Sequence, residues 1–276
     1  MALSLSAQPR ELQTNFDTYV FGDKINVRME PSPDAKVVAQ LVGGDKVTIL
    51  ENTEKTHTAN GTTLPWSKVR FGKGQTGYVW SGLLSFAGEV THNKLRFTVG
   101  LTNTKAGSSP DEMADCTFEM RVFDEKGAIV DKNTVNIPTT GGANVWTELS
   151  PEAGGLAGYK AVLKVNIGYE ACGYPQYDWY LLWTGTKSVA LPLCNSISDA
   201  DVFHHIESYV FPQPLSENDR GHFGEPDQLF FMVSHGESTY PDDNDTAGWN
   251  EDSWVRARPM VWDGKKYIRP VIEDKK

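Results

Sequence analysis

Turn-forming residues recur about every ten positions over the first third of this chain, between short stretches where apolar and polar residues alternate. Ile25, Val27 and Met29 alternate with polar neighbours, residues 31–34 read PSPD, and a glycine pair at 43–44 precedes the next alternation. Alternation places side chains on opposite faces of a strand, whereas proline, glycine and aspartate favour turns. Such short strands predict a small antiparallel barrel.

The barrel pattern continues to about residue 86. Residues 52–64 are rich in Thr and Asn, and we expect them to form a polar loop. Pro65-Trp66 opens the next strand, Gly72 and Gly74 frame a hairpin, and residues 77–80 (GYVW) complete the set.

Five groups of residues resemble the bacterial SH3 (SH3b) domain in order and spacing. They are Asn26-Val27-Arg28, Pro31-Ser32, Gly44-Asp45-Lys46-Val47, Trp66 with Lys68-Val69, and Gly77-Tyr78-Val79 followed by Leu83-Leu84. The resemblance covers roughly residues 17–86 and implies an SH3-like barrel in a bacterial protein. The chain departs from the family pattern in the long 52–64 segment and at Met29-Glu30.

The resemblance also implies a role. Such domains commonly act outside the cytoplasm, in the periplasm or after secretion, as targeting or interaction modules for peptidoglycan or a protein partner, and they are not catalytic. A ligand groove would use exposed aromatic side chains, and the candidates are Trp66, Tyr78 and Trp80. Tyr78 and Trp80 share one face of a strand, with Val79 opposite. The alternative is that Trp66 and one of the other two pack the small core.

The charge of the chain argues against two classes of partner. The formal net charge is −10, and residues 1–86 carry nine Lys/Arg and eight Asp/Glu, so the excess acid lies beyond them. A duplex-nucleic-acid binder normally shows a basic face, and an anionic membrane surface repels an acidic chain. No apolar run reaches the ~18 residues of a transmembrane segment. Residues 1–16 form an N-terminal tail, in which ALSLSA is either the end of a truncated signal peptide or a frayed start.

Residues 92–276 predict a larger antiparallel β domain, so the fold class is all-β. Hairpins are expected at the turns 124–127, 184–186 and 263–265, and their similar shapes leave weak repetition of a hairpin unit open. Residues 202–211 alternate like a strand, although Ser and Asp ahead of them leave a short helix over 196–207 as the alternative. The aromatic-rich stretch 177–183 is either a buried strand or a row of rings for stacking a ligand.

Three widely spaced cysteines, Cys116, Cys172 and Cys194, exclude a zinc ribbon and a dense disulfide framework. A disulfide between Cys172 and Cys194 across a hairpin stays open, as do three reduced thiols. Neither of these two cysteines begins a helix, where a thiolate would be favoured, so a thiol hydrolase is disfavoured.

The main candidate for a metal-binding site lies in an acidic loop near 213–252. Asp242, Asn244 and Asp245 supply oxygen ligands suited to Ca²⁺, but the spacing is not that of an EF-hand, and a solvated acidic loop is the simpler interpretation. No other cofactor is expected. His204-His205 with Glu207 is too short a pattern to predict a zinc site.

These observations predict a non-enzymatic, extracytoplasmic binding protein whose barrel engages peptidoglycan or a protein partner. One rival is a wall or polysaccharide hydrolase that uses carboxylates among Glu170, Asp178 and Glu207. The other is a Ca²⁺-stabilised structural or adhesion module.

Overall fold

The computed structural model describes residues 13–107, 113–139, 143–169, 171–199, 202–212, 228–239 and 250–272. Within these residues the chain forms β-strands and two short 3₁₀ helices, with no α-helix, which confirms the all-β fold class. None of the described helices is long and apolar enough to span a membrane. The chain divides into two compact units, Met1–Glu148 with Thr186–Ser188, and Leu149–Gly185 with Val189–Lys276. The predicted domain boundary between residues 86 and 92 stays a prediction.

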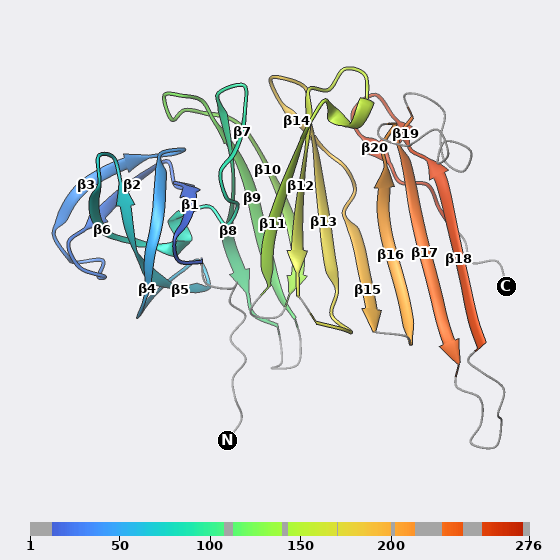
Figure 1. The fold of residues 1–276 in the computed structure, drawn as a ribbon, viewed down its shortest axis with the longest axis horizontal. Helices are drawn as coiled ribbons and strands as arrows, with labels where there is room; N and C mark the ends of the chain where they lie inside the picture. The colour runs from blue at the N-terminus through green and yellow to red at the C-terminus, as the bar shows by residue number, and fades with distance from the viewer. Residues whose placement is uncertain are drawn as a thin grey trace. The chain divides into compact units, whose positions relative to one another are not determined.

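The first unit begins with the expected barrel, a curled six-stranded sheet drawn in blue to cyan in Figure 1. Its strands are β1 (Phe16–Tyr19), β2 (Lys24–Arg28), β3 (Val37–Val42), β4 (Lys46–Ala59), β5 (Thr62–Phe71) and β6 (Gln75–Trp80), in the order β1-β4-β5-β6-β2-β3. The alternation seen in the sequence places Val27, Ile49, Val69 and Val79 in its core, each fully buried. The 3₁₀ helix η1 (Ser81–Leu83) follows β6.

The prediction of a polar loop over residues 52–64 was wrong. Strands β4 and β5 run through this segment as a paired arm, with Ala59 opposite Thr62 in the register. The arm turns at Asn60 and Gly61, whose φ angles of 51° and 73° are those of the mirror-image turn that joins tight hairpins. The threonines are polar, but their branched Cβ favours strands, and this preference decides the structure.

A four-stranded antiparallel sheet completes most of the first unit. It contains β7 (Val90–His92), β8 (Leu95–Lys105), β9 (Ala114–Phe123) and β10 (Ile129–Thr139), in the order β10-β9-β8-β7. Strands β9 and β10 form the hairpin expected at residues 124–127. The Asp124 carboxylate accepts hydrogen bonds from the backbone N–H groups of Ala128 and Lys126 across this turn, and these bonds lower its pKa.

The barrel packs directly on this sheet at two glycines. A Cβ placed on Gly43 would lie 2.1 Å from the Phe123 ring, and one on Gly100 would lie 2.5 Å from the ring of Phe21. Arg121 lies over the Phe21 ring at 4.2 Å and donates a hydrogen bond of 3.0 Å to Asp23. The two sheets therefore fit together only because neither glycine carries a side chain.

The second unit is dominated by one large antiparallel sheet. In chain order its elements are β11 (Asn144–Pro151), which crosses the unit boundary, η2 (Ala153–Gly155), β12 (Ala161–Gly168), β13 (Gln176–Trp183), β14 (Ser188–Ala190), β15 (Cys194–Asp199), β16 (Phe203–Val210), β17 (Phe230–Thr239) and β18 (Asn250–Pro259). A short hairpin, β19 (Val261–Trp262) and β20 (Tyr267–Ile268), turns at residues 263–265 as predicted.

The structure decides between the alternatives that the sequence left open for residues 196–211, for residues 177–183 and for the three hairpins. Residues 203–210 are strand β16 and residues 194–199 are strand β15, so the short helix over 196–207 was the wrong alternative. The rings in the stretch 177–183 are buried on both faces of β13, which is the buried-strand interpretation. The three similar hairpins belong to three different sheets and form no repeated unit among the described residues.

Arg269 holds the C-terminal segment onto the large sheet. Its guanidinium donates to both carboxylate oxygens of Glu207 at 3.1 Å and to the carbonyl of Leu193, and it lies 4.3 Å from the centre of the Phe231 ring. Both bonds to Glu207 come from Nη1 and the bond to Leu193 from Nη2, so one planar guanidinium holds two groups of the sheet at a fixed spacing.

We predict that Gly43→Ala destabilises the protein by about 1–3 kcal/mol, because the added methyl group overlaps the Phe123 ring. Phe123→Leu removes that overlap, so the double variant should lose less free energy of unfolding than the sum of the two single variants. Urea denaturation of the four proteins measures this coupling. Strictly additive effects would mean that the two residues do not meet.

We predict that Arg269→Met lowers the free energy of unfolding by about 2 kcal/mol, because Glu207 loses its charged partner in a mostly buried position. Arg258→Met is the matched control, since Arg258 is exposed and should change stability by at most about 0.5 kcal/mol. Thermal melting compares the two variants, and equal shifts would contradict the role given to Arg269.

Candidate ligand-binding surfaces of the N-terminal barrel

Three rings form an aromatic cluster (His57, Trp66 and Trp80) at one end of the barrel. Trp66 on β5 lies directly opposite Trp80 on β6 in the strand register. The His57 ring centre is 5.3 Å from that of Trp80, edge-on, and 6.3 Å from that of Trp66. Edge-to-face pairs of this kind are favourable beyond the area they bury, so the cluster holds its rings in fixed positions.

Two contacts fix the position of the Trp80 ring, one with Gly82 and one with the backbone of Leu64. It lies flat over Gly82, where an added Cβ would come within 2.5 Å of the ring. Its indole N–H donates a hydrogen bond of 3.2 Å to the carbonyl of Leu64. Trp80 is half-buried, so part of its ring remains available to a ligand.

The three predicted binding residues differ in exposure. Trp66 is only 4% exposed and packs the core, whereas Tyr78 and Trp80 are half-buried on the same face of β6. Tyr78 lies opposite Lys68 on β5 and Arg28 on β2. The structure thus places all three residues on one face of the strand pair, with Tyr78 and Trp80 the more accessible.

His57 was overlooked as a member of this surface, because it belongs to the segment expected to be a loop. The Asn60-Gly61 dipeptide between threonine-rich stretches was the signal for a hairpin. The arm that carries His57 is also anchored at its tip. The N–H of Thr104 on β8 donates to the carbonyl of Asn60 at 3.0 Å, and the Thr62 and Thr104 hydroxyls are hydrogen-bonded.

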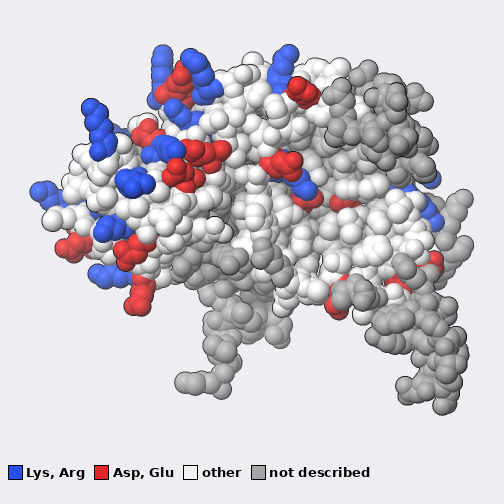
Figure 2. Space-filling view, in the orientation of Figure 1, with Lys and Arg blue, Asp and Glu red and all other residues white. Residues whose placement is uncertain are grey.

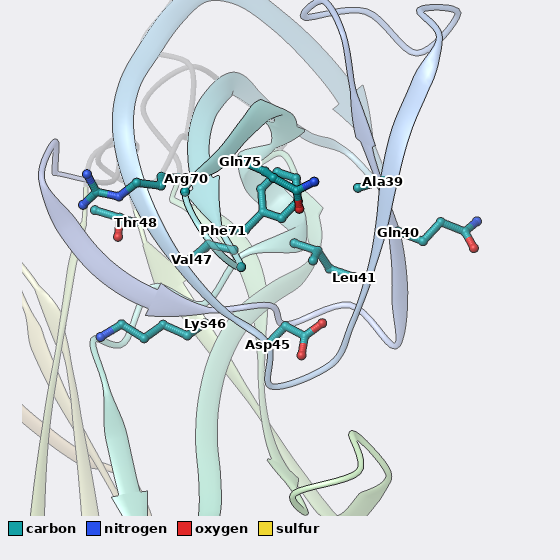
Figure 3. A pocket seen from close by; sticks show the side chains of 12 residues that line it. Ala39, Gln40, Leu41, Asp45, Lys46, Val47, Thr48, Arg70, Phe71 and Gln75 are labelled. Atoms are coloured by element: carbon teal, nitrogen blue, oxygen red, sulfur yellow. The ribbon is translucent and has the colours of Figure 1, made fainter.

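A groove of about 680 Å³ lies elsewhere on the barrel, between the edge strand β3 and the β4–β5–β6 strands. Figure 3 shows Leu41, Val47 and Phe71 pointing toward one another in its centre, with Lys46 and Arg70 extending to one side. Its lining is therefore mixed, with an apolar floor and polar walls.

The charges beside this groove are largely paired. Lys46 forms ion pairs with Glu89 and with Asp17 at 2.9 Å, and both carboxylates raise the pKa of the lysine. The pKa of Asp17 is lowered, first by the Thr48 hydroxyl and then by Lys46. Arg70 is exposed at the same side of the groove. On the face drawn in Figure 2, positive and negative side chains are mixed over the barrel.

Residues 23–85 match the family model of the bacterial SH3 domain. The match confirms the resemblance found in the sequence, and it contains the aromatic cluster and the groove. No match to the chain was found among the curated proteins or the solved structures.

Outside the bacterial SH3 domain, the candidate catalytic carboxylates are held in structural contacts. Asp178 forms an ion pair with Lys164 at 3.0 Å and accepts a hydrogen bond from Asn166, and Glu207 is bound by Arg269. Glu170 lies outside the described residues, as do Asp242, Asn244 and Asp245.

Histidines of the second unit meet in one place. His205 and His235 lie opposite each other with ring centres 5.8 Å apart, and each has a glutamate within 4 Å. Among the residues that the structure describes, no three His, Cys, Asp or Glu side chains are placed to hold one metal ion.

The three cysteines are free thiols in very different surroundings. Cys116 and Cys194 are buried, whereas Cys172 is exposed. Burial raises the pKa of Cys194 to about 12 and also raises that of Cys116, because the thiolate loses its hydration.

We predict that one thiol of the native protein reacts rapidly with an aromatic disulfide reagent at pH 8, and that Cys172→Ser abolishes this reaction. Cys116 and Cys194 are buried and so inaccessible to the reagent, and the pKa of Cys194, about 12, also keeps that thiol protonated at the pH of the assay. The number of thiols titrated before and after denaturation is the measurement. Rapid reaction of the Cys172→Ser variant would contradict the prediction.

Proposed function

We propose that this protein is a non-enzymatic, extracytoplasmic binding protein of bacteria, whose SH3 domain attaches it to peptidoglycan. The observation that carries the proposal is the match of residues 23–85 to the bacterial SH3 domain. The accessible rings of Tyr78 and Trp80 support it, because a fixed aromatic surface stacks well on sugar rings and on peptide groups. A protein partner on the same surface is the alternative.

The barrel surface favours recognition by shape and stacking over recognition by charge. The Lys46 charge is matched by two carboxylates, and the barrel face drawn in Figure 2 carries side chains of both signs. Peptidoglycan combines sugar rings with short peptides, so it offers groups for both the aromatic cluster and the groove beside β3. Binding to this polymer should therefore depend weakly on salt.

The hydrolase alternative has less support. Asp178 is paired with Lys164 and Glu207 with Arg269, so each of these two carboxylates is engaged in a contact that holds the fold together.

We predict that the intact chain sediments with purified insoluble peptidoglycan and that Tyr78→Ala weakens this binding at least tenfold, the usual loss when an important aromatic contact is removed. Tyr174→Ala is the matched control, because Tyr174 is an exposed tyrosine of the second unit with 46% of its surface accessible. Point variants are needed instead of a fragment lacking the barrel, since the barrel and its neighbouring sheet share one packed interface.

The outcomes separate the alternatives. Binding that Tyr78→Ala weakens and Tyr174→Ala leaves unchanged supports the proposal. Binding that is lost in Arg70→Glu, with Tyr78→Ala unaffected, would move the ligand to the groove beside β3. Failure of the intact chain to bind peptidoglycan would overturn wall attachment and favour a protein partner.

A further inference from the structure

The hairpin β19–β20 follows β18 near the C-terminal end of the second unit (Figure 1), and it exposes large apolar side chains. Val261 and Ile268 are paired across it, and they are 61% and 41% exposed. Trp262 on the other face is 44% exposed, and Val271 just beyond is 81% exposed. Single exposed apolar residues are ordinary, but four large ones within eleven residues, two of them paired on one face of the hairpin, are an unusual concentration that normally marks an interaction.

The same segment reverses the charge of the chain. Residues 254–272 contain five Lys/Arg and a single acidic residue, Asp263, in a chain with a net charge of −10. Arg269 is paired with Glu207, so Lys265 and Lys266 at the turn and Arg258 beside it supply the exposed positive charge.

Asp263 does not neutralise the turn lysines through their side chains. Its carboxylate accepts hydrogen bonds of 2.8 Å from the backbone N–H groups of Lys265 and Lys266, which shape the turn and lower its pKa. Among the described residues, neither lysine side chain forms an ion pair. Both lysines are exposed, and they belong to a turn whose shape is fixed by the hydrogen bonds between the main chain and Asp263.

The hairpin is also anchored to the core of the second unit, to which it belongs. The Trp262 and Tyr267 rings meet edge-to-face with centres 5.1 Å apart, and Met260, Tyr267 and Ile272 pack against the core of the second unit. The exposed side chains are therefore presented by an ordered support and lose little conformational freedom on binding.

We propose that this hairpin docks on an anionic lipid surface. Val261, Ile268 and Val271 enter the boundary between headgroups and acyl chains, Trp262 lies at the headgroup level where tryptophan is enriched, and Lys265 and Lys266 contact lipid phosphates. The net negative charge of the chain does not prevent this contact. Charges more than ~10 Å away are largely screened at physiological salt, so the local positive charge dominates at the surface.

The test is co-sedimentation of the full chain with vesicles of phosphatidylcholine alone and with vesicles that contain phosphatidylglycerol. We expect binding only to the second kind, and weaker binding as salt rises. The double variant Lys265→Gln/Lys266→Gln should bind roughly 25-fold more weakly, since each lysine near such a surface contributes about 1 kcal/mol. Val261→Ser/Ile268→Ser should also lose binding, because both side chains are exposed and their replacement leaves the core intact.

The matched control is Lys73→Gln/Lys126→Gln, which changes the net charge equally at two exposed turns of the first unit. An equal loss in this control, or no binding of the intact chain to anionic vesicles, would overturn the proposal. So would binding to an anionic wall polymer, with no binding to vesicles, that depends on the same two lysines. The result is independent of peptidoglycan binding, because Tyr78→Ala leaves the hairpin unchanged and should bind vesicles normally.

Discussion

The contact between Gly43 and Phe123 sets the organisation of the first unit. A ring can approach a backbone this closely only where no Cβ intervenes, and the same geometry recurs where Phe21 covers Gly100. These two contacts, with Arg121 between them, join the barrel to the four-stranded sheet as one packed body. The turn between β3 and β4 is thereby occupied. The aromatic cluster and the groove beside β3 remain as surfaces for a ligand.

The long arm of β4 and β5 has its explanation in the same packing. Residues 52–64 are where the chain departs from the pattern of the bacterial SH3 domain, and they form the arm whose tip is bound to Thr104 of the neighbouring sheet. The extra length thus serves a contact that a free-standing barrel would not make. It also brings His57 against Trp80, so the same arm contributes to the candidate ligand-binding surface and to the attachment of the barrel.

Sequence patterns predicted the parts of this structure that local rules determine. Alternation located most strands, and Gly127 and Gly264 marked two hairpin turns at positive φ. Parity placed Tyr78 and Trp80 on one face of β6, but it did not separate the buried Trp66 from the accessible Trp80, because burial depends on Gly82 and the arm. The packing of the Phe123 ring on Gly43 could not be predicted either. A glycine pair before a strand looks like an ordinary turn, and Phe123 lies 80 positions further along the chain.

Average charge is a poor guide to what each surface of this protein can bind. The barrel carries nearly balanced charges, and its Lys46 is paired with Asp17 and Glu89, so the proposed recognition there rests on stacking and shape. The hairpin β19–β20 belongs to the acidic part of the chain, yet the segment around it, residues 254–272, carries five Lys/Arg against one acidic residue, Asp263. The two binding proposals therefore differ in their physical basis: peptidoglycan binding by the barrel should depend weakly on ionic strength, whereas lipid binding by the hairpin should depend on it strongly.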